Sequence, residues 1–183
     1  MNAPAAHAQA QPFSQSPAEN YERYFVPAIG APMAEDLIRA AALQPGERVL
    51  DRGGRVLVNV PGPKPPLFAI MTEALARHVA PQAAAFADVV FSLYDVDAIA
   101  KLVRDAGFSD VKVQARPKPL RLPLPADFFR QYVHSTPLIE PVSKVSAEQR
   151  AALEEEVCGR WQALVREGAL PVEVGMTTAA ARA

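Results

Sequence analysis

The sequence predicts an α/β fold in which helices pack on a mixed sheet of about four or five strands. Short continuous apolar runs bounded by glycine and proline are typical of strands. Between them, apolar residues recur every three or four positions, which is the pattern of amphipathic helices. A chain of 183 residues with 50% apolar and 21% charged residues is also typical of one globular domain with its own core.

Composition and charge limit the possible surroundings and partners. Residues 1–16 form a Pro/Ala/Gln-rich tail that predicts disorder, and residues 17–183 form the single domain. The net charge of −1 offers no basic field to nucleic acid. No apolar run reaches the ~18 residues of a membrane span, and the first residues lack a signal-peptide pattern. The single Cys158 excludes an internal disulfide and a Cys-cluster metal site, so we expect a cytoplasmic location.

The first elements are a helix and two strands that lie very close together in the sequence. Apolar spacing predicts a helix over residues 20–42, which a Gln-Pro-Gly sequence stops. The apolar runs 49–51 and 56–60 suit strands that are buried on both faces. Only three residues separate Asp51 from Arg55, whereas a crossover between parallel strands needs a dozen or more. The two runs therefore form an antiparallel hairpin or merge into one bent strand.

Further helices and strands follow in alternation. Helical spacing predicts a helix over residues 65–79. Asp95 can cap the next helix, Gly107 can end it in a left-handed conformation, and residues 111–113 alternate as a strand. The inner face of that helix is expected to comprise Ile99, Leu102, Val103 and Ala106.

The last third of the chain is rich in helix signals. Residues 117–125 read as a Pro-rich connection and residues 126–135 as a short helix. Ser146 opens a capping box for a long helix that ends at Gly168. Residues 170–182 alternate as a final strand.

Four segments carry a family resemblance: NYERYFVPAIGAPMAEDLIRAAALQPGERVLD, RGGRVLVNVPGP, FSLYDVDAIAKLVRDAGFSDVKV and PVEVGMTTAAAR. In this order they resemble the first helix and strand, the fifth strand, a later helix and strand with Ala-Gly-Phe, and the C-terminal hairpin of class I S-adenosylmethionine-dependent methyltransferases. The resemblance is to the small-molecule kind that includes ubiquinone and menaquinone biosynthesis enzymes. It implies a reduced Rossmann-like sheet and a small organic methyl acceptor.

The resemblance also implies a cofactor, S-adenosylmethionine, and residues that contact it. Asp51 matches the acid at the end of the first strand that helps to place the methionine end, and Tyr21, Tyr24 and Phe25 match an aromatic segment that closes over the cofactor. Asp51 can equally be a turn residue, and the aromatic residues can belong to an amphipathic helix that needs cover. The family's Gly-x-Gly-x-Gly loop and ribose-binding acid have no counterpart here. We therefore expect weak or no cofactor binding.

The acceptor side is expected in the segment of residues 117–145, where the family places its variable lid. Phe128 and Tyr132 are the candidate substrate contacts, because they combine apolar surface with a polar handle. His134 is the candidate base, since its unperturbed pKa lies near neutrality; the alternative is an ordinary surface or capping histidine. No His-x-x-x-His or acidic cluster predicts a metal site.

These observations favour one functional hypothesis and leave two alternatives. The first is a member of the methyltransferase family that acts on a small organic acceptor and is impaired or inactive in this form. The second is a non-catalytic interaction or dimerisation module, because a sheet without its inner strands exposes an edge that can pair with another chain. The third is the product of an internal deletion at the junction after Asp51.

Overall fold

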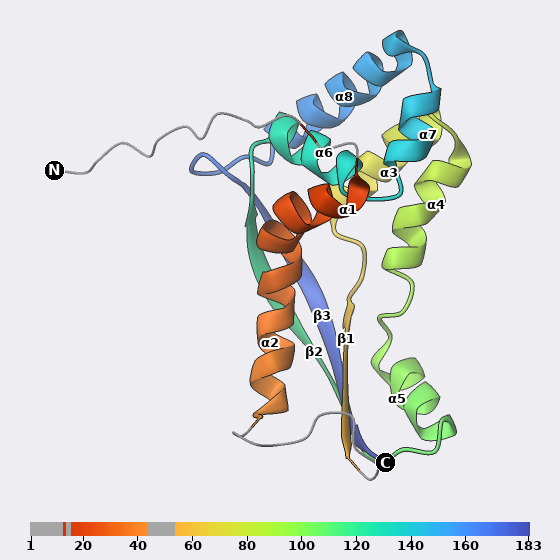
Figure 1. Cartoon of the computed structure of the whole chain (residues 1–183), viewed down its shortest axis with the longest axis vertical. Coiled ribbons are helices and arrows are strands. Elements are labelled where there is room, and N and C mark those ends of the chain that lie inside the picture. Colours follow the sequence, from red (N-terminus) through yellow and green to blue (C-terminus); the bar gives the residue numbers. More distant parts are fainter. Residues whose placement is uncertain (1–12, 14–15, 44–53) are drawn as a thin grey trace, which may run out of the picture.

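The computed structural model describes residue 13 and residues 16–43 and 54–183. Most of the helices gather at one end of a long sheet, where β2 ends and β3 begins (Figure 1). The elements, in chain order, are α1 (Pro17–Asn20), η1 (Tyr21–Gly30), α2 (Ala31–Ala41), β1 (Arg55–Pro61), α3 (Pro66–His78), α4 (Pro81–Val90), α5 (Val96–Asp105), β2 (Ser109–Leu122), α6 (Pro125–His134), α7 (Ile139–Lys144), α8 (Ala147–Gln162) and β3 (Leu170–Arg182).

The described part of the chain contains a three-stranded sheet with the order β1-β3-β2. Both neighbouring pairs are antiparallel, so β1 and β2 run in the same direction on either side of β3. The expected α/β fold is confirmed. The expected mixed sheet of about four or five strands is corrected to an antiparallel sheet with fewer strands among the described residues. The strand expected at residues 49–51 lies outside the described residues.

The expectation that the apolar run at 56–60 is buried on both faces is wrong. Val58, in the middle of β1, is 44% exposed. The reason is its place in the sheet: within the described residues, β1 has a neighbour on one side only, and that neighbour is β3. A run of β-branched residues predicts a strand but not whether it is central or at an edge.

The Pro-rich segment is part of a strand rather than the expected connection. β2 continues to Leu122, and within it Pro117 pairs with Gly175 and Pro119 with Glu173 of β3. The two prolines are two residues apart, so their missing N–H groups face the same side of the strand. Because β2 is an edge strand, that side can face away from β3 without loss of a ladder hydrogen bond.

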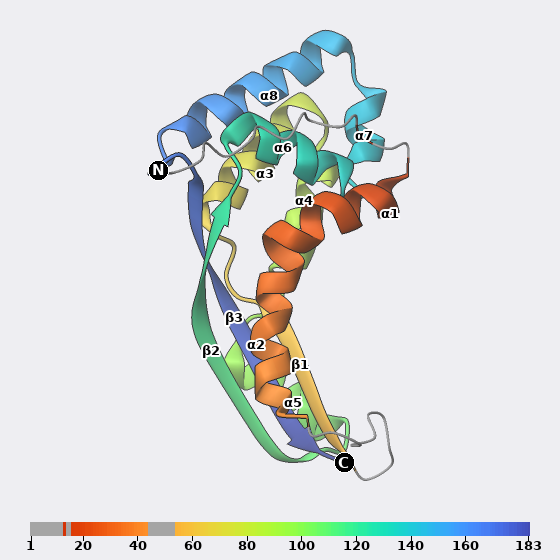
Figure 2. The same ribbon diagram turned by 60° about the vertical axis from the view of Figure 1, so that its left-hand side comes forward.

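Helices cover both faces of the sheet, with α2 in front of the strands and α5 behind them (Figure 2). Three side chains of the sheet hold α2 in place, and one of them, Arg55, donates to the Ala41 backbone oxygen at 2.7 Å. The Asn59 side-chain amide donates to the backbone oxygen of Met33 at 3.1 Å. Lys118 of β2 lies 3.1 Å from Asp36 of α2, and this contact lowers the pKa of the Asp36 carboxyl.

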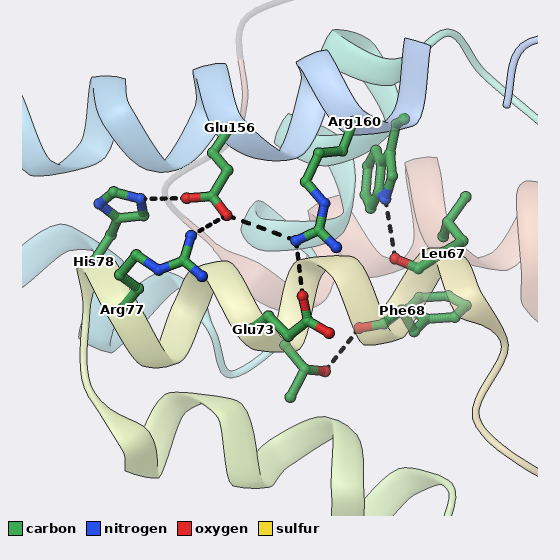
Figure 3. Close-up of polar contacts among 9 residues, drawn as sticks. Leu67, Phe68, Glu73, Arg77, His78, Glu156 and Arg160 are labelled. Carbon is green, nitrogen blue, oxygen red and sulfur yellow. Dashed lines mark hydrogen bonds and ion pairs between the residues drawn. The ribbon is translucent and has the colours of Figure 1, made fainter. Parts of the chain in front are cut away.

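A buried hydrogen bond and several ion pairs join α8 to α3. The indole Nε1 of the fully buried Trp161 donates to the backbone oxygen of Leu67 at 2.9 Å. Further along the same interface, Glu156 accepts from His78 at 2.8 Å and pairs with Arg77 (Figure 3). These two partners lower the pKa of the Glu156 carboxyl. The buried Trp161 indole and the partly exposed ion pairs of Glu156 thus align α8 with α3.

Several local predictions are confirmed, and two others are corrected. Asp95 accepts a hydrogen bond from the Ala98 backbone N–H at 2.7 Å, and Gly107 has a φ of 90°, as its role in ending the helix requires. The capping box at Ser146 is present, but α8 ends at Gln162 rather than Gly168. Of the expected inner face of α5, Ile99 is buried and Val103 half-buried, whereas Leu102 is 55% exposed and Ala106 is also exposed.

Candidate functional site

An apolar cavity of about 70 Å³ lies where the helical end meets the sheet, and it is partly open to solvent. Its walls come from η1, α2, α3, α6, the end of α4 and all three strands. No charged side chain is among the residues that line it. The lining residues used below are Phe25, Ile29, Pro61, Phe68, Tyr132 and Val174.

The sequence of η1 explains how it reaches the cavity. Pro27 lies inside this helix and Pro32 in the first turn of α2, so two backbone donors of an ordinary α-helix are missing. The helix adopts the wider π-helical turn instead, which is a common device near functional sites. Phe25 and Ile29 are four residues apart and both line the cavity.

Two glycines approach each other closely next to residues of the cavity wall. The Gly62 backbone N–H donates to the Gly175 backbone oxygen at 2.5 Å, next to Pro61 in the cavity wall. A Cβ at Gly62 would lie 2.9 Å from both the Cα and the oxygen of Gly175. Such a distance leaves no room for a side chain, so glycine at position 62 allows this close approach at the end of β1, next to the cavity wall.

Tyr132 is the one lining residue whose side chain carries an oxygen or nitrogen atom. It is 4% exposed and lies between Phe25, Phe68 and Phe128, with ring centroids 6.1, 5.4 and 5.7 Å away. No described residue hydrogen-bonds to its hydroxyl, although no fully enclosed side-chain oxygen in the described chain lacks a partner. The hydroxyl therefore keeps some accessible surface. Burial raises the pKa of the phenol, so it stays protonated.

Phe128, the other expected substrate contact, lies behind Tyr132. It is 2% exposed and packs on Trp161 at a centroid distance of 5.4 Å. It lines a smaller hollow of about 10 Å³ together with Tyr24 and Tyr132, rather than the main cavity. Phe128 therefore supports the position of Tyr132 from the core side.

The two expected cofactor tyrosines lie on η1 but differ in their surroundings. Tyr21 is 41% exposed and stacks on Phe25, with ring centroids 4.6 Å apart. Tyr24 borders the smaller hollow and meets Phe13 edge-on at 5.1 Å. Asp51, the expected partner of the cofactor, lies outside the described residues, so the three are not brought together in one described site.

His134, the candidate base, lies at the end of α6 and is not among the residues that line the cavity. Its ring stacks flat on Phe13, with centroids 4.3 Å apart and an interplanar angle of 3°. Partial burial lowers the pKa of the imidazole. Its backbone oxygen accepts from the buried Asn20 side chain at 3.3 Å, and the Ser135 hydroxyl donates to the Asn20 backbone oxygen at 3.0 Å. These contacts describe a histidine that anchors the N-terminal segment on α6.

The chemistry of other titratable groups adds no second candidate. In the described ranges, no group of three or more His, Cys, Asp or Glu side chains could hold a metal ion. Cys158 is half-buried, and desolvation raises the pKa of its thiol to about 11. No helix in the described part of the chain is long and apolar enough to cross a membrane.

Sequence reasoning missed the part of the cavity that α4 supplies. Phe91 is 7% exposed, lines the cavity and packs on Phe68 at 5.2 Å. The signal was present, because Ala83, Ala87 and Phe91 recur every four residues, which is helical spacing. Because this segment is rich in alanine, its buried and exposed helix faces differ little in hydrophobicity, and the helical pattern is weak.

Geometry alone thus defines a small, partly open apolar site with one phenolic donor. Comparison with known proteins adds no identification, since no protein-family model matches the chain and no curated protein matches it.

Proposed function

We propose that the chain is a member, by descent, of the class I S-adenosylmethionine-dependent methyltransferases, with a small organic molecule as its ligand. The observation that carries this proposal is the succession β1, α5, β2 and β3, in which β2 and β3 pair antiparallel. The resembling segments imply the same succession of fifth strand, helix, strand and C-terminal hairpin. The sheet is then a reduced form of the Rossmann-like sheet of that family.

We also propose that this chain transfers methyl groups poorly or not at all. Cofactor binding in such a sheet depends on a glycine-rich turn that leads from a strand into a helix N-terminus. After Asp51 the chain has only Arg52, Gly53 and Gly54 before β1 begins at Arg55, so no such helix follows. His134 stacks on Phe13 rather than lining the cavity, which leaves the proposed acceptor without the expected base.

The apolar cavity beside Tyr132 supports the small-molecule part of the proposal. Ligand sites are concave and mostly apolar, with few polar groups that fix the orientation of the ligand. The cavity combines these properties, and it lies at the end of β1, next to the expected lid helix α6. The single half-buried cysteine suits a reducing compartment, and we extend the proposal to a cytoplasmic location.

Isothermal titration of the purified 183-residue chain tests the cofactor side. We expect no saturable heat with S-adenosylmethionine or with S-adenosylhomocysteine at concentrations up to about 1 mM, where binding contributes only ~4 kcal/mol. A radiolabelled methyl donor should likewise leave no label on candidate acceptors. Micromolar binding of either compound would overturn the proposed loss of cofactor binding.

The free side of β1 favours a second candidate function, a dimerisation module. Of the described strands, only β3 pairs with β1, and Val58 in its middle is 44% exposed. Such an edge is a template for another strand. Light scattering across a hundredfold concentration range tests this idea: a concentration-dependent rise to twice the monomer mass supports it, and a constant 19.7 kDa contradicts it.

A further inference from the structure

We infer that the cavity binds the short apolar part of a neutral molecule that offers one hydrogen-bond acceptor to the Tyr132 hydroxyl. This inference rests on the proposed function, because it names the ligand chemistry of the small-molecule site. The ligand class is that of small ethers and ketones, or larger molecules that end in such a group. The size of the cavity, its apolar lining and its single hydroxyl-bearing side chain each restrict the ligand in a different way.

The size of the cavity excludes large ligands from its interior. Its volume is about 70 Å³. An engineered dry cavity of roughly 150 Å³ encloses a whole benzene molecule, so a cavity of this size takes in only part of such a ring. The cavity therefore holds a group of a few heavy atoms. Because the cavity is partly open, the rest of a ligand can extend toward solvent.

The lining excludes charged groups from the interior. None of the residues that line the cavity is charged, so an ion placed there would lose its hydration without a compensating partner. Water is also poorly held, because an ordered buried water needs two to four polar partners and only one lining side chain can hydrogen-bond. A neutral ligand that displaces such water gains affinity.

Tyr132 is the only lining residue whose side chain can supply a strong, directional hydrogen bond. Its pKa is raised by burial, so across the physiological range it acts as a hydrogen-bond donor rather than as an anion. Three aromatic rings, those of Phe25, Phe68 and Phe128, hold the side chain in place. Little conformational freedom remains to be lost when a ligand accepts the hydrogen bond.

A pair of probes that differ only in the acceptor tests the inference. Tetrahydrofuran and cyclopentane have nearly the same shape, but only tetrahydrofuran has an oxygen. Methyl NMR titration should show binding of both to the wild-type chain on the order of 1–10 mM, as befits five heavy atoms. The shifts should concentrate on Ile29 and Val174 of the cavity and spare the exposed Val89. The preference for tetrahydrofuran, expressed as the ratio of the cyclopentane to the tetrahydrofuran dissociation constant, should be about fivefold higher in the wild type than in a chain without the hydroxyl.

Tyr132→Phe removes the hydroxyl and retains the ring. We expect it to bind cyclopentane as the wild type does and tetrahydrofuran about fivefold more weakly. Tyr94→Phe, at an exposed tyrosine outside the cavity, should keep the wild-type ratio and serves as the matched control. Retained folding of both variants is checked by circular dichroism.

Two outcomes overturn the inference: the cavity methyl groups of the wild type respond to neither probe, or Tyr132→Phe retains the preference. The proposed methyltransferase descent is tested separately by the cofactor titration, whose outcome does not depend on these probes. Probe binding without cofactor binding supports both proposals. Cofactor binding at micromolar concentration would overturn the impaired-enzyme proposal and leave the ligand chemistry of the cavity intact.

Discussion

Replacement of Trp161 by phenylalanine is expected to weaken the attachment of α8 to α3. The indole donates to the Leu67 backbone oxygen at 2.9 Å, and this hydrogen bond is worth about 1 kcal/mol. The smaller ring also leaves a cavity of roughly 40 Å³, which at about 24 cal/mol per Å³ costs about 1 kcal/mol. The free energy of unfolding should therefore fall by about 2 kcal/mol, and the melting temperature by about 4–8 °C.

Urea unfolding followed by far-ultraviolet circular dichroism measures this change, because it does not depend on the indole that the substitution removes. Arg160→Gln is the matched control on the same helix turn. Arg160 pairs with Glu73 at 2.8 Å, but its side chain is 40% exposed, so the loss should stay below about 1 kcal/mol. A Trp161→Phe loss no larger than that of Arg160→Gln would refute the reasoning that the buried indole is the main anchor of α8.

Three further predictions concern other parts of the fold. Gly62→Ala should destabilise the chain by about 1–3 kcal/mol, because its Cβ would lie 2.9 Å from backbone atoms. Gly159→Ala, in open space on α8, should instead stabilise it by about 0.5–1 kcal/mol, and urea midpoints of both variants decide the matter. Cys158, with its thiol pKa raised from 9.0 to about 11, should react with iodoacetamide at pH 8 about 100-fold more slowly than a cysteine of unshifted pKa; equal rates would refute this. The lowered pKa of Glu156 contributes stability that is present above its unfolded value of 4.5 and is lost as the pH falls through the folded value. Glu156→Gln should therefore flatten the acid side of the stability profile, whereas an unchanged slope would contradict the linkage.

Elements with strong local signals were predictable from the sequence. Asp95, Gly107 and Ser146 mark helix ends by side-chain or backbone chemistry that acts within a few residues, and the structure confirms all three. Apolar spacing also predicted α3 and α6, which carry Phe68 and Tyr132. Local rules succeed where the partner of a residue is close in the sequence.

Features that depend on distant partners were not predictable in the same way. Whether β1 is central or at an edge depends on β3, which lies more than a hundred residues later. The prolines of β2 read as a connection because nothing local shows which side of the strand faces its neighbour. The residues that line the cavity likewise come from eight different helices and strands. The sequence could therefore suggest Tyr132 as a ligand contact but not the residues that surround it.

The two edges of the sheet differ in a way that limits any assembly. Pro117 and Pro119 lie in β2 and can donate no backbone hydrogen bond to an added strand, while β1 has no proline between Arg55 and Pro61. If two copies pair through β1, both remaining edges are β2 edges that resist further strands. Growth by edge pairing then stops at two chains, because the prolines act as terminators of polymerisation and oppose fibre formation.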